Sequence, residues 1–195
     1  RLEQCLSLES TNPKNLSAVY INLGIASLYQ YDRTGQIADL DASIIYTQKA
    51  LSLISKDSPA YISCLGNLAN GYSTRFEQSG KIADLIQSIQ LHKTVLALTP
   101  VNHPDRYTRL SNLGGCLRLS HIHTGQVADL EEAIRLLREA SNCVPINSSD
   151  LPLVLHRLGT CLRDNYCRIS NLADLEESLQ LYRQALKLLP EGSPN

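Results

Sequence analysis

The chain of 195 residues contains no methionine, and its first residue is Arg1. We therefore expect it to be either a processed protein or a piece of a longer one. No apolar run approaches the ~20 residues that a membrane-spanning helix requires. The first residues also lack the pattern of a secretory signal peptide. These absences predict a soluble, cytoplasmic protein that does not bind membranes.

A large excess of charge of either sign is also missing, since 18 basic and 19 acidic residues leave a formal net charge of −1. Non-specific binding of nucleic acid requires a basic surface, so we do not expect a nucleic-acid partner. Hydrophobic residues make up 43% of the chain and charged residues 19%, which is typical of an ordinary globular protein.

The six cysteines and five histidines show no zinc-site or redox Cys-x-x-Cys spacing. A catalytic nucleophile needs its base within hydrogen-bond reach. His156 and Cys161 are five residues apart on one expected helix, and His121 and His123 are two apart, so the members of each pair diverge around the helix axis. We therefore predict no catalysis, no metal site and no cofactor. We expect reduced, structural cysteines, because a chain of this length with apolar helical stripes does not need disulfides.

The dominant feature of the sequence is a repeat of 45 residues. A frame of the type Gln-Ile-Ala-Asp-Leu recurs at residues 36–40, 81–85, 126–130 and 171–175. Self-similarity at such a period is the signature of a helical-repeat array. We expect a single array over residues 1–195. Its predicted parts are a leading half unit at residues 1–13 and four units at residues 14–58, 59–103, 104–148 and 149–193.

Each unit has the pattern of two helices. In the second unit, one helical face is formed by Tyr61, Leu65, Leu68, Tyr72 and Phe76. Gly80 then permits a left-handed helix end, and Pro100 stops the second helix after another apolar stripe. Alternating strand patterns are absent. The sequence predicts an all-α fold with about nine helices, of which the first is Arg1–Glu9.

A recurring aspartate opens the second helix of every unit. The four positions are Asp39, Asp84, Asp129 and Asp174. A carboxylate in the first turn stabilises a helix by ~0.3–1 kcal/mol, because it faces unpaired N–H groups and the positive end of the dipole. The alternative interpretation is a row of metal-binding or catalytic carboxylates.

Three further frames resemble the tetratricopeptide repeat. The Leu-Gly step is matched at residues 23–24, 113–114 and 158–159, with Leu-Ala at 68–69. Small residues of the second helix match at Ser43, Ser88, Ala133 and Ser178, and a terminal proline matches at 100, 145 and 190. The resemblance implies a right-handed solenoid of helical hairpins. The period departs from the common one of about 34 residues, which implies a longer first helix.

A longer string resembles one subgroup, the long repeats of fungal multi-domain proteins that often precede a CHAT domain, a caspase-like peptidase module. The string consists of Asn67-Leu68, Arg75-Phe76, Gly80, Asp84-Leu85 and His103-Pro104-Asp105-Arg106. The peptidase module itself is not in this sequence.

The same resemblance places the first helix of each unit on a concave face. The exposed columns there would be Asn22, Asn67, Asn112 and Arg157; Ile25, Asn70, Gly115 and Thr160; and Leu28, Ser73, Arg118 and Arg163. The candidate binding residues are Asn67, Asn70, Asn112, Arg118, Arg157 and Arg163. Asparagine can pair with a peptide backbone, and arginine can hold a carboxylate through two hydrogen bonds.

Two alternatives remain at these columns. The asparagines could bond to a neighbouring helix, and Arg118 and Arg163 could simply form a solvated face. These inner columns contain no lysine, so the sequence does not support the carboxylate clamp of the tetratricopeptide family.

The sequence therefore predicts a protein-interaction scaffold that binds a peptide or protein partner in the concave groove. The alternative is a regulatory arm that gates a caspase-like protease, in which case the partner is another domain of the same chain. A purely structural spacer is a third interpretation.

Overall fold

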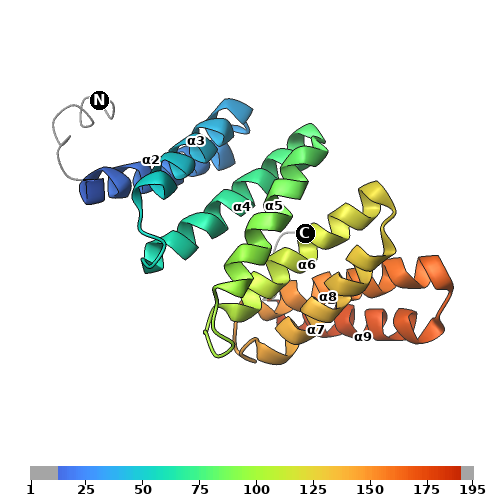
Figure 1. Cartoon of the computed structure of the whole chain (residues 1–195). Coiled ribbons are helices and arrows are strands. Elements are labelled where there is room, and N and C mark those ends of the chain that lie inside the picture. Colours follow the sequence, from blue (N-terminus) through green and yellow to red (C-terminus); the bar gives the residue numbers. More distant parts are fainter. Residues whose placement is uncertain (1–12, 190–195) are drawn as a thin grey trace. The chain divides into compact units, whose positions relative to one another are not determined.

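The structure is a computed structural model that describes residues 13–189, with side chains from Asn15 onward. All of its regular structure in this range is helical (Figure 1). The helices are α2 (Pro13–Thr34), α3 (Ile37–Leu53), α4 (Pro59–Ser79), α5 (Ile82–Ala97), α6 (Arg106–Thr124), α7 (Val127–Cys143), α8 (Leu151–Ile169) and α9 (Leu172–Leu188).

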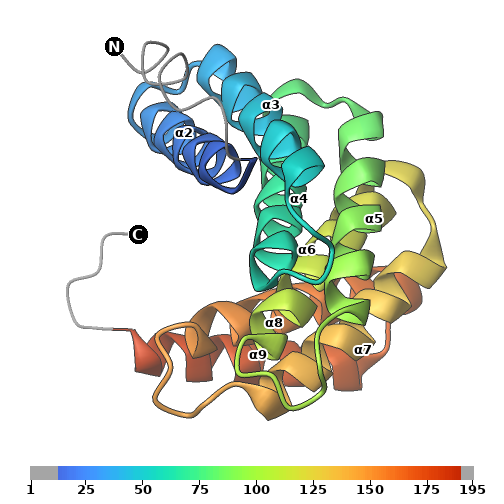
Figure 2. The same ribbon diagram turned by 60° about the vertical axis from the view of Figure 1, so that its left-hand side comes forward.

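The chain divides into two compact units between Leu98 and Thr99. In the first unit α2 packs on α3, α4 packs on α5, and α3 packs on α4. The second unit repeats this scheme with α6 on α7, α8 on α9 and α7 on α8, and α6 also contacts α8 (Figures 1 and 2). The predicted all-α fold of helical hairpins is thus confirmed. The predicted helix at Arg1–Glu9 lies outside the described residues.

The first helix of every pair ends on a left-handed residue. Gly35, Gly80 and Gly125 have φ angles of 67°, 68° and 72°, and Ser170 has a φ angle of 55°. The N–H of each residue donates to the carbonyl four residues earlier, as from Gly80 to Phe76 at 2.7 Å. The two helices of each pair are separated by two residues, the left-handed residue and the one that follows it. The predicted role of these positions is confirmed, even where the last pair has serine.

Replacing Ser170 by glycine is expected to stabilise the second unit by about 1 kcal/mol, because a side chain pays a steric cost in the left-handed region that glycine avoids. The reverse change, Gly125→Ser, serves as the matched control and is expected to destabilise by a similar amount. Chemical denaturation of the two variants measures both effects. A Ser170→Gly variant less stable than the parent chain would contradict this account.

The Leu-Gly step marks the closest approach of the two helices in a pair. A Cβ atom built on Gly114 would lie 2.8 Å from Cγ of Leu137, and one on Gly159 would lie 3.0 Å from Cε1 of Tyr182. The second pair has Ala69 at this position, and its carbonyl accepts a hydrogen bond of 2.8 Å from the Ser88 hydroxyl. The small residues of both helices are therefore required by helix packing.

The recurring aspartates lie in the first turn of α3, α5, α7 and α9, as predicted. Their carboxylates also accept hydrogen bonds from the preceding helix. Ser120 donates to Asp129 at 2.6 Å, Asn165 donates to Asp174 at 2.7 Å, and Arg75 holds Asp84 through two bonds. The column thus starts the second helix and ties it to the first. Residues 13–189 contain no group of three or more side chains that could hold a metal ion.

The cysteines that the structure describes are free thiols, and three of them are buried. Burial raises the pKa of Cys64, and it raises the pKa of Cys161 to about 12. The thiol of Cys161 is therefore protonated at neutral pH and packs as a small apolar group. None of the described helices combines the length and the apolar character needed to cross a membrane.

Candidate functional site

The first unit presents an uncharged stripe on each of its first helices. We name this set the amide face: Asn22, Ile25 and Tyr29 on α2, and Ser63, Asn67 and Asn70 on α4. Successive members on one helix are three or four residues apart, so each helix shows them on one side. All six are exposed, and Tyr29 has 71% of its surface in solvent. The face therefore offers three amide groups, a serine hydroxyl, a phenol ring with its hydroxyl and one aliphatic side chain to a ligand.

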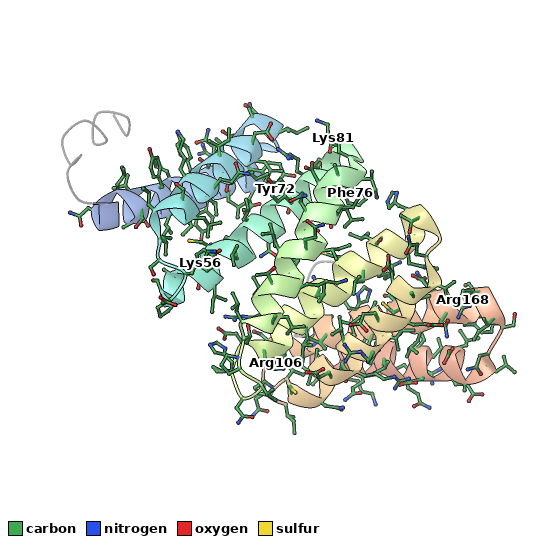
Figure 3. All side chains as sticks on the ribbon, in the orientation of Figure 1. Lys56, Tyr72, Phe76, Lys81, Arg106 and Arg168 are labelled. Carbon is green, nitrogen blue, oxygen red and sulfur yellow. The ribbon has the colours of Figure 1, made fainter. Side chains whose placement is uncertain are left out.

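Asn67 and Asn70 flank the buried step of α4. Leu68 is 6% exposed and Ala69 is fully buried. The asparagines on either side of them, Asn67 and Asn70, are exposed to solvent. One face of α4 therefore packs against neighbouring helices, and another face is exposed to solvent. Side chains of all these helices are drawn in Figure 3, where Tyr72 and Phe76 mark the following turns of α4.

The equivalent asparagine of the second unit is engaged by a neighbouring helix. Nη1 of Arg157 on α8 donates to Oδ1 of Asn112 at 3.1 Å and to the Ser111 hydroxyl at 2.9 Å, both on α6. Asn112 and Arg157, two of the predicted site residues, are thus brought together with each other. At this repeat the structure favours the alternative in which the amide links helices.

Arg118 and Arg163, the other two predicted residues of the second unit, meet at one carboxylate. Nε of Arg118 lies 2.6 Å from Oδ2 of Asp164, and Nη2 of Arg163 lies 2.9 Å from Oδ1. The hydrogen bond to Asp164 raises the pKa of Arg163 above its ordinary value. The side chain of Arg163 is 48% exposed and that of Asp164 only 16%. We name these three residues the arginine–aspartate cluster.

A cavity of about 400 Å³ adjoins this cluster. It is lined by Arg118, His121, Ile122, Gly125, Asp164 and Cys167. Nδ1 of His121 lies 2.8 Å from the carbonyl oxygen of Gln126, which can only accept, so Nδ1 is the donor. The cavity therefore combines a guanidinium, an imidazole, a carboxylate and one apolar side chain.

One position of the predicted columns is buried in the second unit. Thr160 donates to the carbonyl of His156 at 2.8 Å and accepts from the Tyr182 hydroxyl at 3.1 Å. Only 8% of its surface is exposed. Because Tyr182 is on α9, this threonine joins the two helices of its own pair and does not contribute to a binding surface.

Two residues of the first helices were missed by the sequence columns, namely the exposed Tyr29 and the partly buried Asp164. They occupy the same repeat position, one residue beyond the third predicted column. A signal was available in both cases: Tyr29 follows Ile25 by four residues, and Asp164 is the only acidic residue of α6 and α8. Neither residue type recurs in the column, which is why the repeat pattern did not single it out.

The last helix pair also carries an apolar hollow of about 520 Å³. Its lining includes Pro152, Leu153, His156, Tyr182, Leu186 and Leu189. In α7, Leu130 and Leu137 are fully buried, whereas Leu175, the equivalent of Leu130 in α9, is only partly buried and Leu186 is 71% exposed. The apolar side chains of α9 are therefore more exposed than these leucines of α7.

Comparison with known proteins agrees with the fold of paired helices. Residues 62–105 match the family model described as tetratricopeptide repeat. The fold of the described residues is that of a tetratricopeptide-like repeat array. No curated protein matches its sequence at a significant level.

Solved structures share the fold of this array at low sequence identity. Two crystal structures of nearly identical TPR-like repeats from Podosopora anserina superpose with TM-scores of 0.65 and 0.63 at 16% and 17% identity. The superpositions include 96% and 98% of this chain. They include 82% and 86% of the two Podosopora chains. The structure of BtubC (BKLC) from P. vanneervenii has a TM-score of 0.62 at 17% identity. The superposition includes 100% of this chain and 73% of the BtubC chain.

Proposed function

We propose that this array is a protein-interaction scaffold that binds a peptide or protein partner on the exposed faces of its first helices, with no catalysis of its own. Tetratricopeptide-like repeats generally mediate protein–protein interaction. The observation that carries the proposal for this chain is the amide face. Its members are exposed on α2 and α4, while their sequence neighbours Leu23, Leu68 and Ala69 are buried.

The chemistry of the amide face suits a polypeptide ligand. Each asparagine amide has both donors and an acceptor, so it can match the N–H and C=O of an extended backbone. Tyr29 offers a large ring with a polar end, a residue type that is enriched at protein interfaces. Asn67 and Asn70 are therefore proposed as backbone-binding residues. Arg118, Arg157 and Arg163 are proposed to contribute positive charge in the second unit, where Asn112 accepts a hydrogen bond from Arg157.

Crosslinking from defined positions tests this proposal. A photo-reactive phenylalanine analogue placed at Tyr29 or Asn67 is expected to capture the same partner protein, and the crosslinked segment of that partner is then synthesised as a peptide. The same analogue at Gln87, an exposed residue of α5, is the positional control. Equal capture from Gln87 would remove the support for the amide face.

The peptide then measures the energetic contribution of the amides. The double variant Asn67→Ala, Asn70→Ala is expected to bind the peptide at least ~10-fold more weakly, since two hydrogen bonds contribute about 1 kcal/mol each. Gln87→Ala should bind like the parent chain. Unchanged affinity of a folded double variant would show that the partner binds elsewhere. The second predicted role, a regulatory arm of a caspase-like protease, stays a prediction from sequence resemblance.

A further inference from the structure

Charge is unevenly distributed between the helices of the second unit. The first helices, α6 and α8, carry six arginines and one aspartate. The second helices, α7 and α9, carry seven acidic and four basic residues. In the first unit, α2 and α4 carry three basic and two acidic residues, so no such separation exists there. The first helices of the second unit therefore carry a net positive charge in a protein whose net charge is near zero.

Some of these arginines are bound by carboxylates of the second helices. Arg106 contacts Glu139 at 2.9 Å, and Arg168, labelled in Figure 3, lies 3.8 Å from Glu131. Arg118 and Arg163 differ, because both contact the same carboxylate, that of Asp164, which lies on the first helix α8 and not on a second helix. Two guanidinium groups thus meet one carboxylate, which leaves a local positive charge.

A third arginine adds to this charge. Arg118 and Arg157 both bridge the contact between α6 and α8, since Arg118 of α6 lies 2.6 Å from Asp164 and Arg157 of α8 lies 2.9 Å from Ser111. Arg157 donates to the uncharged side chains of Ser111 and Asn112. The cavity of about 400 Å³ opens beside Arg118 and Asp164, so a ligand group has space next to the cluster.

We propose that the arginine–aspartate cluster binds a carboxylate of an acidic polypeptide segment, and that Asp164 is a built-in competitor that limits the affinity of this site. The inference rests on the proposed function in one respect only, namely that the first helices carry the binding surface. It adds the chemical class of the partner and a regulatory role for a residue of the chain itself.

The geometry explains how the exchange works. Each arginine has five N–H donors, and the bonds to Asp164 involve Nε of Arg118 together with Nε and Nη2 of Arg163. An incoming carboxylate can therefore bind the remaining donors, or replace Asp164 on Arg163, whose side chain is half exposed. Asp164 repels a carboxylate that binds the remaining donors, and it competes with a carboxylate that binds Arg163 in its place. Its removal strengthens both modes of binding.

Fluorescence anisotropy with the full chain tests the class of partner. The probes are a fluorescein-labelled hexaglutamate and a hexaglutamine of the same length. Hexaglutamate is expected to bind at least ~10-fold more tightly at low salt and to lose most of this advantage above ~0.3 M salt, where exposed charges are screened. Equal affinity of the two peptides would overturn the proposal.

Two variants test the competitor. Asp164→Asn preserves the shape and is expected to tighten hexaglutamate binding about fivefold, whereas Arg163→Gln should weaken it by a similar factor. The control for net charge is Glu176→Gln, since Glu176 is an exposed residue of α9 and this change removes the same charge from a different surface. An Asp164→Asn variant that binds like Glu176→Gln would contradict the role of Asp164.

Circular dichroism confirms that each variant is folded before binding is measured. If Asp164→Asn does not fold, Arg163→Gln decides, because unchanged affinity of that variant for hexaglutamate would overturn the proposal. Failure here is distinguishable from failure of the proposed function, which is tested in the first unit through Tyr29, Asn67 and Asn70.

Discussion

Replacing Gly114 by leucine is expected to lower the free energy of unfolding of the second unit by about 3 kcal/mol, at the upper end of the usual cost of overpacking. Even a Cβ atom there would lie 2.8 Å from Cγ of Leu137 and 3.2 Å from one of its methyl groups. Leu137 is fully buried and cannot move aside into solvent. Thermal unfolding followed by circular dichroism should show a midpoint lowered by more than ~10 °C.

The adjacent glycine provides the matched control. A Cβ atom on Gly115 would meet only the guanidinium of Arg157, at 3.8 Å, which is an ordinary contact distance. Gly115→Ala is therefore expected to stabilise α6 by ~0.5–1 kcal/mol, because alanine loses less backbone entropy in a helix. If Gly114→Leu and Gly115→Ala had the same effect, the Leu-Gly step would not mark a close helix crossing.

The helix pairs could be predicted from the sequence because each repeated frame has a local physical cause. A residue at the end of the first helix must adopt positive φ, and the aspartate that follows faces free N–H groups of the next helix. Ser170 shows the strength of this register, since it takes the left-handed conformation that glycine has in the other pairs. The boundaries of the two compact units were not predictable, because the same frame continues unchanged across Leu98 and Thr99.

The candidate site was predictable in part. The columns of the first helices correctly indicated exposed positions at Asn67 and Asn70. They could not distinguish these from Asn112, whose partner Arg157 comes from the same column of the next repeat. A hydrogen bond between repeats depends on which residue types face each other, and the period alone does not contain that information. Asp164 was missed because no other repeat has an acidic residue at its position.

An arginine that holds one buried and one partly exposed carboxylate accounts for the second large effect that we predict. Arg75 on α4 holds Asp84 on α5 through Nε and Nη2, at 2.8 and 2.6 Å, and contacts Asp41 on α3 at 2.7 Å. The hydrogen bond to Asp84 is the main cause of a raised pKa at Arg75. The guanidinium also lies 5.3 Å from the ring centre of Tyr72. One side chain thus links three helices of the first unit.

Replacing Arg75 by methionine is expected to destabilise the first unit by about 3 kcal/mol. The side chain of Asp84 is 8% exposed, so the change leaves a buried carboxylate without its counter-charge, which is the costly way to break such a pair. Arg135→Met is the control, because Arg135 pairs with Glu132 at the surface, with 59% and 41% of the side chains exposed, and such pairs contribute less than ~1 kcal/mol. Urea unfolding of both variants gives the comparison.

A second substitution identifies the cause of the loss. Adding Asp84→Asn to the Arg75→Met chain removes the buried charge and is expected to recover part of the lost stability, although each change alone destabilises. This non-additivity is the expected signature of two groups in direct contact. Strictly additive losses would mean that Arg75 stabilises the unit through its packing on Tyr72 and its contact with Asp41, and that Asp84 tolerates burial through the N–H groups of the first turn of α5.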